Sequence, residues 1–452
     1  PNLVDGLKPS QRKILFSCIK RNLKGEIKVA QLAGYVSEHS AYHHGETSLH
    51  SSIVHMAQNF VGSNNIPLLY PSGQFGTRLN GGKDHASARY IFTRLNELTR
   101  YIFHPDDDAI LGYQEEDGAQ IEPTFYVPIL PMVLVNGAEG VGTGWSTFVP
   151  SFDWRSIVSC LEALLNAEDV TSVQLKDVDI PCHYEGFKGR IEYNQEGSKY
   201  ISRGVVRAHP KNKYQYVIEE LPVRKWTDDF KKTLHLAVKE KEDHINVTSF
   251  VEHNTESQVR IVLNVSKADI DRATAKGKSS ADIAEMLCDQ FKLETSLPAS
   301  NMTLFTAEGK IQRFHSPIDI LQAYFPVRLD FYARRKAHLL KVASEKMQEF
   351  SNKVRFIEYV MKGDVPITRQ SLCDTQEQLN SLGFDDLDGQ FKYLTALPIS
   401  QFSVDQANKL KSRLHDLKEH IRLIEAKSER AMWKDDLEEL KKKLHHSEKT
   451  GP

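Results

Sequence analysis

The strongest constraint on the fold is a set of long apolar seams near the C-terminal end of the 452-residue chain. Apolar residues that recur at alternating intervals of three and four lie on one stripe of a helix, and such a stripe favours pairing with a second helix. We therefore expect two long helices that fold back into an antiparallel coiled-coil arm, with residues 365–403 as an insert at its tip. The seams are Leu340, Ala343, Met347, Phe350, Val354, Ile357 and Met361; Leu410, Leu414, Leu417, Ile421 and Ile424; and a third, Trp433, Leu437, Leu440 and Leu444.

The rest of the chain changes character near residue 125. Before it, helices are expected with Gly- and Asn-rich loops between them, including one on residues 46–60 and one from Tyr90 to Ile102. After it, short β-branched runs alternate with helices, which is typical of an α+β domain. The sequence thus predicts a multidomain, mainly α protein with α+β content, divided into residues 1–125, 126–315 and 316–452. The expected elements of the middle region are strands at 190–193, 214–218 and 259–265, helices at 228–240 and 281–291, and a hairpin at 302–314.

Charge is unevenly distributed along the chain. The formal net charge is -2, yet residues 1–100 contain twelve Lys or Arg against six Asp or Glu. A basic module suggests a polyanion partner, although a solvated basic face explains the charge equally well. Two short helices with a polar connection before Phe60 also form a helix-turn-helix candidate, but most helix pairs bind nothing. The acidic segment 106–122 looks like a surface connection.

Several classes of protein and site are not supported by the sequence. No stretch approaches the ~18 apolar residues of a membrane span, so no membrane partner is expected. The five cysteines are far apart without a CxxC pair, and an intracellular location is the default. Gly277-Lys278-Ser279 and Gly82-Lys83 lack the first glycine of a nucleotide-binding P-loop. His43-His44 has no metal-ligand companion at a suitable spacing, so no metal site is expected within the chain.

Six motifs, taken together, carry a family resemblance. The chain resembles the DNA breakage-reunion region of eukaryotic-type DNA topoisomerase II, a type IIA enzyme, over nearly its whole length. The Ala-Glu-Gly-Val-Gly-Thr-Gly-Trp form favours the eukaryotic type over the bacterial gyrase type. The resemblance implies a winged-helix domain, an α/β tower domain and a coiled-coil arm with a dimer-gate tip. The motifs are DGLKPSQRK at 5–13, YHHGE at 42–46, QNFVGSNN at 58–65, GQFGTRL at 73–79, GGKDHASARY at 81–90 and NGAEGVGTGW at 136–145.

The resemblance implies three catalytic residues. Tyr90 matches the nucleophile that becomes linked to a 5′ phosphate of DNA, Arg89 would stabilise the phenolate and the pentacovalent phosphate, and His44 would bind a non-bridging oxygen. A free tyrosine has a pKa of ~10, so the reaction needs a cationic setting near neutral pH. From the residues alone, one tyrosine among 16 would be assigned to packing.

The resemblance also implies a DNA-binding surface and a wedge. Val141 stands where the family inserts an isoleucine between base pairs; the alternative is that it packs within a Gly-rich turn. Ala88 and His85 replace a common proline and serine, which puts the stiffness of this loop in doubt. The residues expected to contact the DNA are Lys8, Arg12, His43, Gln74, Arg78 and Lys83.

The full enzyme implied by the resemblance is larger than this chain. Its Mg²⁺ ligands would lie in a toprim module upstream of Pro1 and its ATP site in a module further upstream. It would be an ATP-hydrolysing homodimer that relaxes and decatenates double-stranded DNA, in the nucleus or else in a mitochondrion or a virus. The competing hypothesis is a non-catalytic DNA-bridging or chromosome-organising protein, which would have no use for Arg89, Tyr90 and His44 together.

The insert at the tip is expected to meet a second protomer, because it contains more apolar residues than a solvated cap requires. The alternative is that these residues form the small core of the insert itself. They are Leu379, Leu382, Phe384, Phe391, Tyr393 and Leu394.

Overall fold

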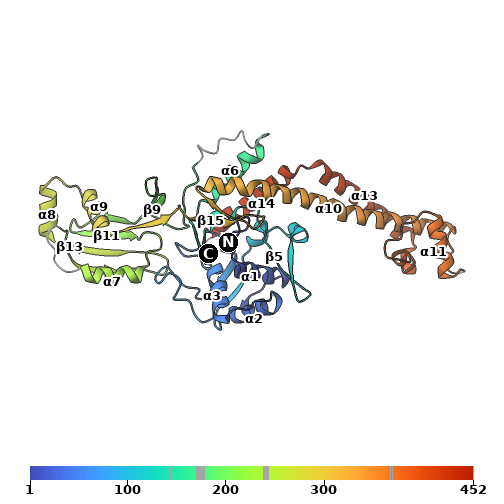
Figure 1. The fold of residues 1–452 in the computed structure, drawn as a ribbon, viewed down its shortest axis with the longest axis horizontal. Coiled ribbons are helices and arrows are strands. Elements are labelled where there is room, and N and C mark those ends of the chain that lie inside the picture. The colour runs from blue at the N-terminus through green and yellow to red at the C-terminus, as the bar shows by residue number, and fades with distance from the viewer. Residues whose placement is uncertain (143, 169–178, 238–243, 367, 369, 451–452) are drawn as a thin grey trace. The chain divides into compact units, whose positions relative to one another are not determined.

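The computed structural model describes residues 1–142, 144–168, 179–237, 244–366, 368 and 370–450 (Figure 1). The chain divides into two compact units, each of which is described by itself. The first comprises residues 1–328 and 434–452, and the second comprises residues 329–433. The first unit mixes helices with several small antiparallel sheets, and the second is helical. The predicted combination of α and α+β structure is confirmed at this level.

The N-terminal part of the first unit contains three helices and a three-stranded antiparallel sheet in the order β1-β3-β2. Apolar residues at helical spacing, such as Ile14 and Cys18, Leu32 and Val36, and Ile53, are buried between the helices. The predicted helix at 46–60 is present but ends at Ala57. The elements are α1 (Pro9–Lys20), β1 (Ile27–Lys28), α2 (Val29–His39), α3 (Glu46–Ala57), β2 (Leu69–Ser72) and β3 (Phe92–Leu95).

The predicted helix from Tyr90 to Ile102 is wrong. Tyr90 lies in a turn, β3 follows it, and only the short helix α4 (Thr99–Ile102) remains. The apolar residues at helical spacing are also consistent with a strand whose alternate side chains, Thr93 and Leu95, are buried. Pairing with β2 along the whole of β3 then decides in favour of the strand.

The acidic segment 106–122 is not simply a surface connection. Asp107 is buried and pairs with Arg328 over 2.7 Å, and Glu122 is buried and pairs with Lys13 over 3.0 Å. Burial of these carboxylates is possible because each has a cationic partner. The elements from here to the middle region are η1 (Pro105–Ile110), β4 (Tyr113–Glu116), β5 (Ala119–Pro123), α5 (Met132–Val135), β6 (Ala138–Gly142), β7 (Trp145–Val149) and α6 (Trp154–Asn166).

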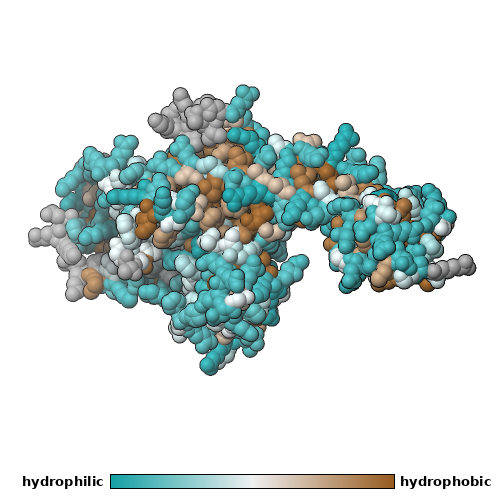
Figure 2. Space-filling view, turned by 45° about the vertical axis from the view of Figure 1, so that its right-hand side comes forward, coloured by the Kyte–Doolittle hydropathy of each residue, from teal (hydrophilic) through white to brown (hydrophobic). Residues whose placement is uncertain are grey.

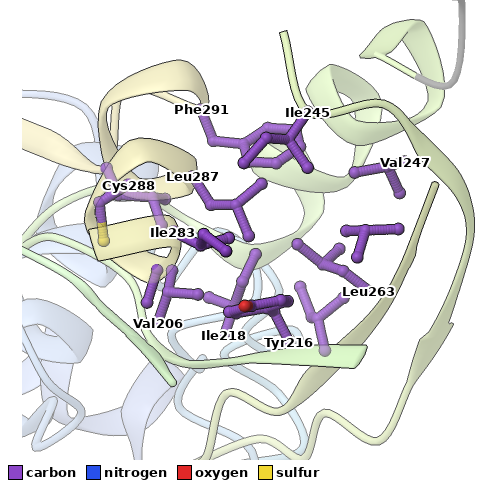
Figure 3. Close-up of a cluster of buried hydrophobic side chains, with 14 of the residues drawn as sticks. Val206, Tyr216, Ile218, Ile245, Val247, Leu263, Ile283, Leu287, Cys288 and Phe291 are labelled. Atoms are coloured by element: carbon purple, nitrogen blue, oxygen red, sulfur yellow. The ribbon is translucent and has the colours of Figure 1, made fainter. Parts of the chain in front are cut away.

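The middle region contains a four-stranded antiparallel sheet, β10-β11-β13-β12, and a three-stranded sheet, β14-β9-β8. Figure 3 shows that Ile283, Leu287 and Cys288 of α9 face apolar side chains of the larger sheet in a buried core. The predicted strands and helices are present, although residues 238–240 of the predicted helix at 228–240 lie outside the described residues. The elements are β8 (Arg190–Asn194), β9 (Lys199–Arg203), β10 (Val205–Ala208), β11 (Gln215–Glu220), α7 (Thr227–Ala237), β12 (Val247–Glu252), β13 (Ile261–Val265), α8 (Lys267–Ala275), α9 (Ser280–Gln290) and β14 (Glu294–Pro298).

The predicted hairpin at 302–314 is formed by β15 (Met302–Phe305) and β16 (Ile311–Phe314). The C-terminal helix α14 (Glu429–Thr450) packs on α6, where Lys441 pairs with Glu162 over 2.7 Å. Leu437, Leu440 and Leu444 of the third seam are therefore buried in the first unit. Residues 434–452 of this helix belong to the first compact unit, whereas the predicted domain 316–452 grouped them with the arm.

The second unit is built on an antiparallel helix pair. A proline within a helix is expected to kink or interrupt it. The α10 helix (Pro317–Lys362) is not interrupted at Pro326. Lys336 Nζ donates to the backbone oxygen of Lys427 over 2.8 Å, while Lys411 pairs with Glu358 over 2.6 Å. Since the early part of α10 meets the end of α13 (Val404–Ala426) and its late part meets the start, the predicted antiparallel pairing is confirmed.

The insert between the two long helices has a small core of its own. Leu379, Phe384, Phe391 and Leu394 are buried there with Phe356 of α10. The alternative hypothesis, a small core within the insert, therefore holds for these four residues, whereas Leu382 and Tyr393 are only partly buried against that core. The insert instead exposes other apolar side chains, namely Leu372, Leu387 and Ile399. Its elements are α11 (Leu372–Ser381), α12 (Lys392–Thr395) and η4 (Ile399–Gln401).

The surface is mostly hydrophilic on the face that Figure 2 shows, with apolar residues gathered in smaller areas. Among the described residues, no helix has both the length and the apolar character needed to cross a bilayer.

Candidate DNA cleavage site

Tyr90 stands at the surface at the end of a long loop. Its side chain is 76% exposed, and its backbone nitrogen donates to the backbone oxygen of Ser87 over 2.9 Å. The neighbouring Arg89 is also exposed, whereas Ala88 is buried. A large aromatic side chain in solvent gains little from burial, so packing does not explain its position.

The start of α2 fixes the backbone on both sides of Tyr90. The backbone nitrogens of Val29 and Ala30 donate to the oxygens of Ile91 and Ala88, each over 3.0 Å. The first amides of a helix have no partner within the helix, and the N-cap residue Lys28 supplies no side-chain acceptor. The loop of Tyr90 satisfies them instead, which holds its backbone while leaving its side chain exposed.

A second set of hydrogen bonds joins the loop at 73–79 to the loop at 81–90. Asp84 accepts from the backbone nitrogen of Thr77 over 2.8 Å and from its hydroxyl over 2.5 Å. Gln58 Nε2 donates to the backbone oxygens of Phe75 and Gly82, over 2.9 and 3.3 Å. A Cβ at Gly82 would lie 2.4 Å from that amide nitrogen, so a side chain does not fit. These contacts make the two loops one connected structure.

Four of the predicted DNA contacts lie at the surface. Lys8 and Lys83 are exposed, and so is Gln74, whose backbone oxygen accepts from the backbone nitrogen of Ala86 over 2.9 Å. His43 is exposed and lies 2.8 Å from a carboxylate oxygen of Glu116. These side chains are accessible to a phosphate backbone.

Arg12 and Arg78 differ from the expectation, because both are buried in ion pairs. Arg12 Nε and Nη2 donate to the Asp5 carboxylate over 2.7 and 3.0 Å. Burial works against the charged form of Arg12, but the charge and hydrogen bonds of Asp5 outweigh it and raise its pKa. Arg78 forms a close ion pair with the buried carboxylate of Glu220. In this geometry both guanidinium groups bind carboxylates of the protein and are not exposed to DNA.

His44 lies in the connection between α2 and α3. Its side chain is exposed, and its ring centroid is 5.4 Å from that of Tyr42, which is buried. The next residue, Gly45, is the N-cap of α3. The structure therefore presents His44 on the surface of the same three-helix part that carries Tyr90.

Val141 lies near the tip of the hairpin β6–β7, where it pairs with Ser146. Its side chain is 90% exposed, which is the opposite of the packed alternative. At the base of the hairpin, Asn136 exchanges two hydrogen bonds of 2.8 Å with the backbone of Ile66. Thr143 lies outside the described residues. A firmly held hairpin thus projects an apolar side chain.

Sequence reasoning missed Gln58, Asp84 and Glu220, which organise the site. For Gln58 and Asp84, the only indication in the sequence was their position as polar residues within Gly-rich motifs. The sequence around Glu220 does not indicate its role, because its partner Arg78 is 142 positions away. Among the described residues, no group of three or more His, Cys, Asp or Glu side chains is arranged to hold a metal ion.

Comparison with known proteins places the chain in a family. The profile of the family described as the A subunit of DNA gyrase/topoisomerase IV matches residues 1–438. The chain is 40% identical to the mitochondrial DNA topoisomerase 2 of Dictyostelium discoideum over 99% of its own length, and 44% identical to the DNA topoisomerase 2 of Arabidopsis thaliana over 85%. It covers only 34% and 25% of those proteins.

A solved structure agrees over nearly the whole chain. The crystal structure of the Plasmodium falciparum topoisomerase II DNA-binding, cleavage and re-ligation domain superposes with a TM-score of 0.86 at 34% identity, covering 99% of this chain and 62% of the other. The chain belongs to the DNA gyrase/topoisomerase IV A-subunit family of type IIA DNA topoisomerases. It is similar to the DNA topoisomerase 2 members of that family and spans about a third of the length of the first of them.

Proposed function

We propose that this chain is the DNA-binding and cleavage core of a type IIA DNA topoisomerase, with Tyr90 as the nucleophile. The observation that carries the proposal is the exposed phenol of Tyr90 on a backbone fixed from both sides, next to Arg89, in a chain of this family. A fixed backbone places the attacking oxygen while the side chain remains accessible to DNA.

In the proposed reaction, Tyr90 Oη attacks a phosphodiester of DNA. An Oη–P bond forms and the bond from phosphorus to the 3′ oxygen breaks. The phenol loses its proton and the leaving 3′ oxygen gains one, so that a 5′ phosphotyrosine and a 3′ hydroxyl result. Arg89 and His44 stabilise the charge on the phosphorus oxygens. The phosphotyrosine ester conserves the energy of the broken bond, so the 3′ hydroxyl can reverse the step without a nucleotide.

DNA binding is assigned to the exposed polar residues around Tyr90. Lys8, His43, Gln74 and Lys83 would contact phosphates, which gives affinity with little base selectivity. Arg12 and Arg78 are assigned to holding these segments in place, because they are buried. Val141 would act as the wedge that enters between base pairs, and such wedges bend DNA by roughly 20–90°.

We assign each of the three predicted domains a role in the proposed enzyme. Residues 1–125 would be a winged helix, which is supported by the order helix, strand, helix, helix, strand, strand and by the sheet order β1-β3-β2. Residues 126–315 would be the tower, and residues 316–452 the coiled-coil arm. The exposed apolar residues Leu372, Leu387 and Ile399 of the insert would form the gate contact with a second copy of the chain.

The whole protein is proposed to be a homodimer that passes one DNA duplex through a double-strand break in another, and so relaxes and decatenates DNA with ATP and Mg²⁺. Among the described residues, no group of carboxylates is arranged to hold the metal. Its ligands and the ATP site are assigned to a toprim module and an ATPase module outside this chain, as the resemblance implies. A nuclear location is proposed, although the relative from Dictyostelium discoideum is named as mitochondrial.

The test is covalent capture of the nucleophile in the full-length enzyme. End-labelled duplex DNA is incubated with the wild-type enzyme and with Tyr90→Phe, the reaction is stopped with denaturant, and the labelled peptide is sequenced. We expect the adduct on Tyr90 alone, and no adduct but normal DNA binding for Tyr90→Phe. An adduct on another residue, or none in the wild type, would favour the non-catalytic bridging function.

A further inference from the structure

A buried ion pair connects the larger sheet of the middle region to the loops of the cleavage site. Both nitrogens of the Arg78 fork donate to Glu220, the last residue of β11. Their residues are 5% and 1% exposed. Removing two charges from water costs several kcal/mol per ion, which only excellent geometry and further hydrogen bonds offset.

Glu220 has such further hydrogen bonds. Its Oε2 accepts from the backbone nitrogen of Lys188 over 3.1 Å, and its Oε1 accepts from that of Leu221 over 2.9 Å. The carboxylate is therefore held by the backbone on one side and by Arg78 on the other. The backbone at Lys188 and Leu221 thus fixes its position independently of the loop.

The segment after β11 makes a second connection to the same loop. The backbone nitrogen of Asp228 donates to the oxygen of Leu79 over 3.1 Å. The indole of Trp226 packs so closely on Gly81 that a Cβ there would lie 2.4 Å from it. Residues 78–81 are thus fixed at both the side chain and the backbone by residues 220–228.

The fixed residues lead to the nucleophile through short steps. Thr77, next to Arg78, is bound to Asp84, and the backbone of Gln74 receives a hydrogen bond from Ala86. Ala86 lies four positions before Tyr90. A displacement of Arg78 would therefore be transmitted to the segment that carries the phenol.

We propose that Glu220 is a positioning residue for strand cleavage. It orients Arg78, and through the Thr77–Asp84 contact it sets the geometry of the loop that ends at Tyr90. The sheet that carries Glu220 would thereby control how well the nucleophile is aligned, although it supplies no group to the reaction. The inference rests on the assignment of Tyr90 as the nucleophile.

The test compares two buried ion pairs in the full-length enzyme. Glu220→Gln removes the charge opposite Arg78. Asp107→Asn does the same opposite Arg328, and this second pair, at 3% and 0% exposed, is as buried as the first and is not among the contacts traced above. The rate of adduct formation is measured at saturating DNA and at a temperature where each variant is folded. We expect at least a tenfold lower rate for Glu220→Gln and a rate within twofold of wild type for Asp107→Asn.

DNA affinity and its salt dependence are measured alongside, and both variants should match the wild type. Arg78→Lys serves if Glu220→Gln does not fold, since it keeps the buried charge but loses the fork geometry; it too should slow adduct formation at least tenfold. A rate within twofold of wild type for the folded variant, or an equal loss in Asp107→Asn, overturns the proposal. An adduct in Tyr90→Phe would instead overturn the assigned nucleophile.

Discussion

The backbone nitrogen of Val29 donates to the backbone oxygen of Ile91 over 3.0 Å, so the first residue of α2 holds the residue that follows Tyr90. The helix thereby uses an otherwise unpaired amide to fix the loop that carries the proposed nucleophile. Because this contact is made by the backbone, it is removed only by a residue that lacks an N–H.

Val29→Pro should slow adduct formation about tenfold, an order-of-magnitude expectation for the loss of alignment. Proline is tolerated at the first position of a helix, and the preceding Lys28 already has an extended conformation. Val29→Ala is the matched control, because it also removes buried apolar volume but keeps the N–H. The measurement is the single-turnover rate of covalent complex formation in the full-length enzyme. Equal rates for the two variants would mean that this hydrogen bond does not align Tyr90.

The salt dependence of DNA affinity should distinguish the exposed lysines, Lys8 and Lys83, from the buried Arg12. Lys8→Ala and Lys83→Ala should each reduce the slope of log affinity against log salt by about 0.9, the value for one phosphate contact. Arg12→Met should instead lower the thermal unfolding midpoint, because it leaves the buried carboxylate of Asp5 without its cation. Fluorescence anisotropy with a labelled duplex, between about 50 and 200 mM salt, measures the slopes. An unchanged slope for Lys8→Ala would remove that residue from the DNA surface.

Val141 is expected to act on DNA shape and not on protein stability. Val141→Ala should leave the unfolding midpoint unchanged, because the side chain is exposed, but should reduce the bend in bound DNA. Val141→Ile should preserve the bend, since isoleucine is an apolar wedge larger than valine. Energy transfer between dyes at the two ends of a bound duplex reports the bend. The wedge assignment fails if alanine bends DNA as strongly as valine.

The sequence predicted the elements whose periodicity was long and regular. The seams of α10 and α13 favoured an antiparallel pair, and the β-branched run at 259–265 favoured a strand. It failed where two structures share one pattern, as from Tyr90 to Ile102, because strand pairing with β2 decided the outcome. The burial of Arg78 could not be predicted from the sequence either, since its partner Glu220 is 142 positions away. Charge alone does not distinguish a cation that binds DNA from one that binds a carboxylate.

The chain alone should bind duplex DNA but cleave it negligibly. The described residues offer the phenol and the basic surface but no cluster of carboxylates for magnesium. The isolated chain and the full-length enzyme are each incubated with supercoiled DNA and Mg²⁺, then denatured and separated on a gel. Efficient double-strand cleavage by the isolated chain, abolished by a chelator, would show that the metal ligands lie within it.

The insert of the second unit should carry the gate contact through its exposed apolar side chains. Ile399 is 90% exposed, and Leu372 lies on the same insert with its side chain largely in solvent. An aspartate at either position would place a charge in a desolvated contact, so Ile399→Asp and Leu372→Asp should each weaken dimerisation at least tenfold. Leu423→Asp is the matched control, because Leu423 is also an exposed leucine of the second unit but lies on α13 outside the insert. Sedimentation equilibrium measures the dissociation constant of the dimer for each variant, and circular dichroism verifies that each variant is folded. If both insert variants dissociate as the control does, the contact between protomers lies elsewhere.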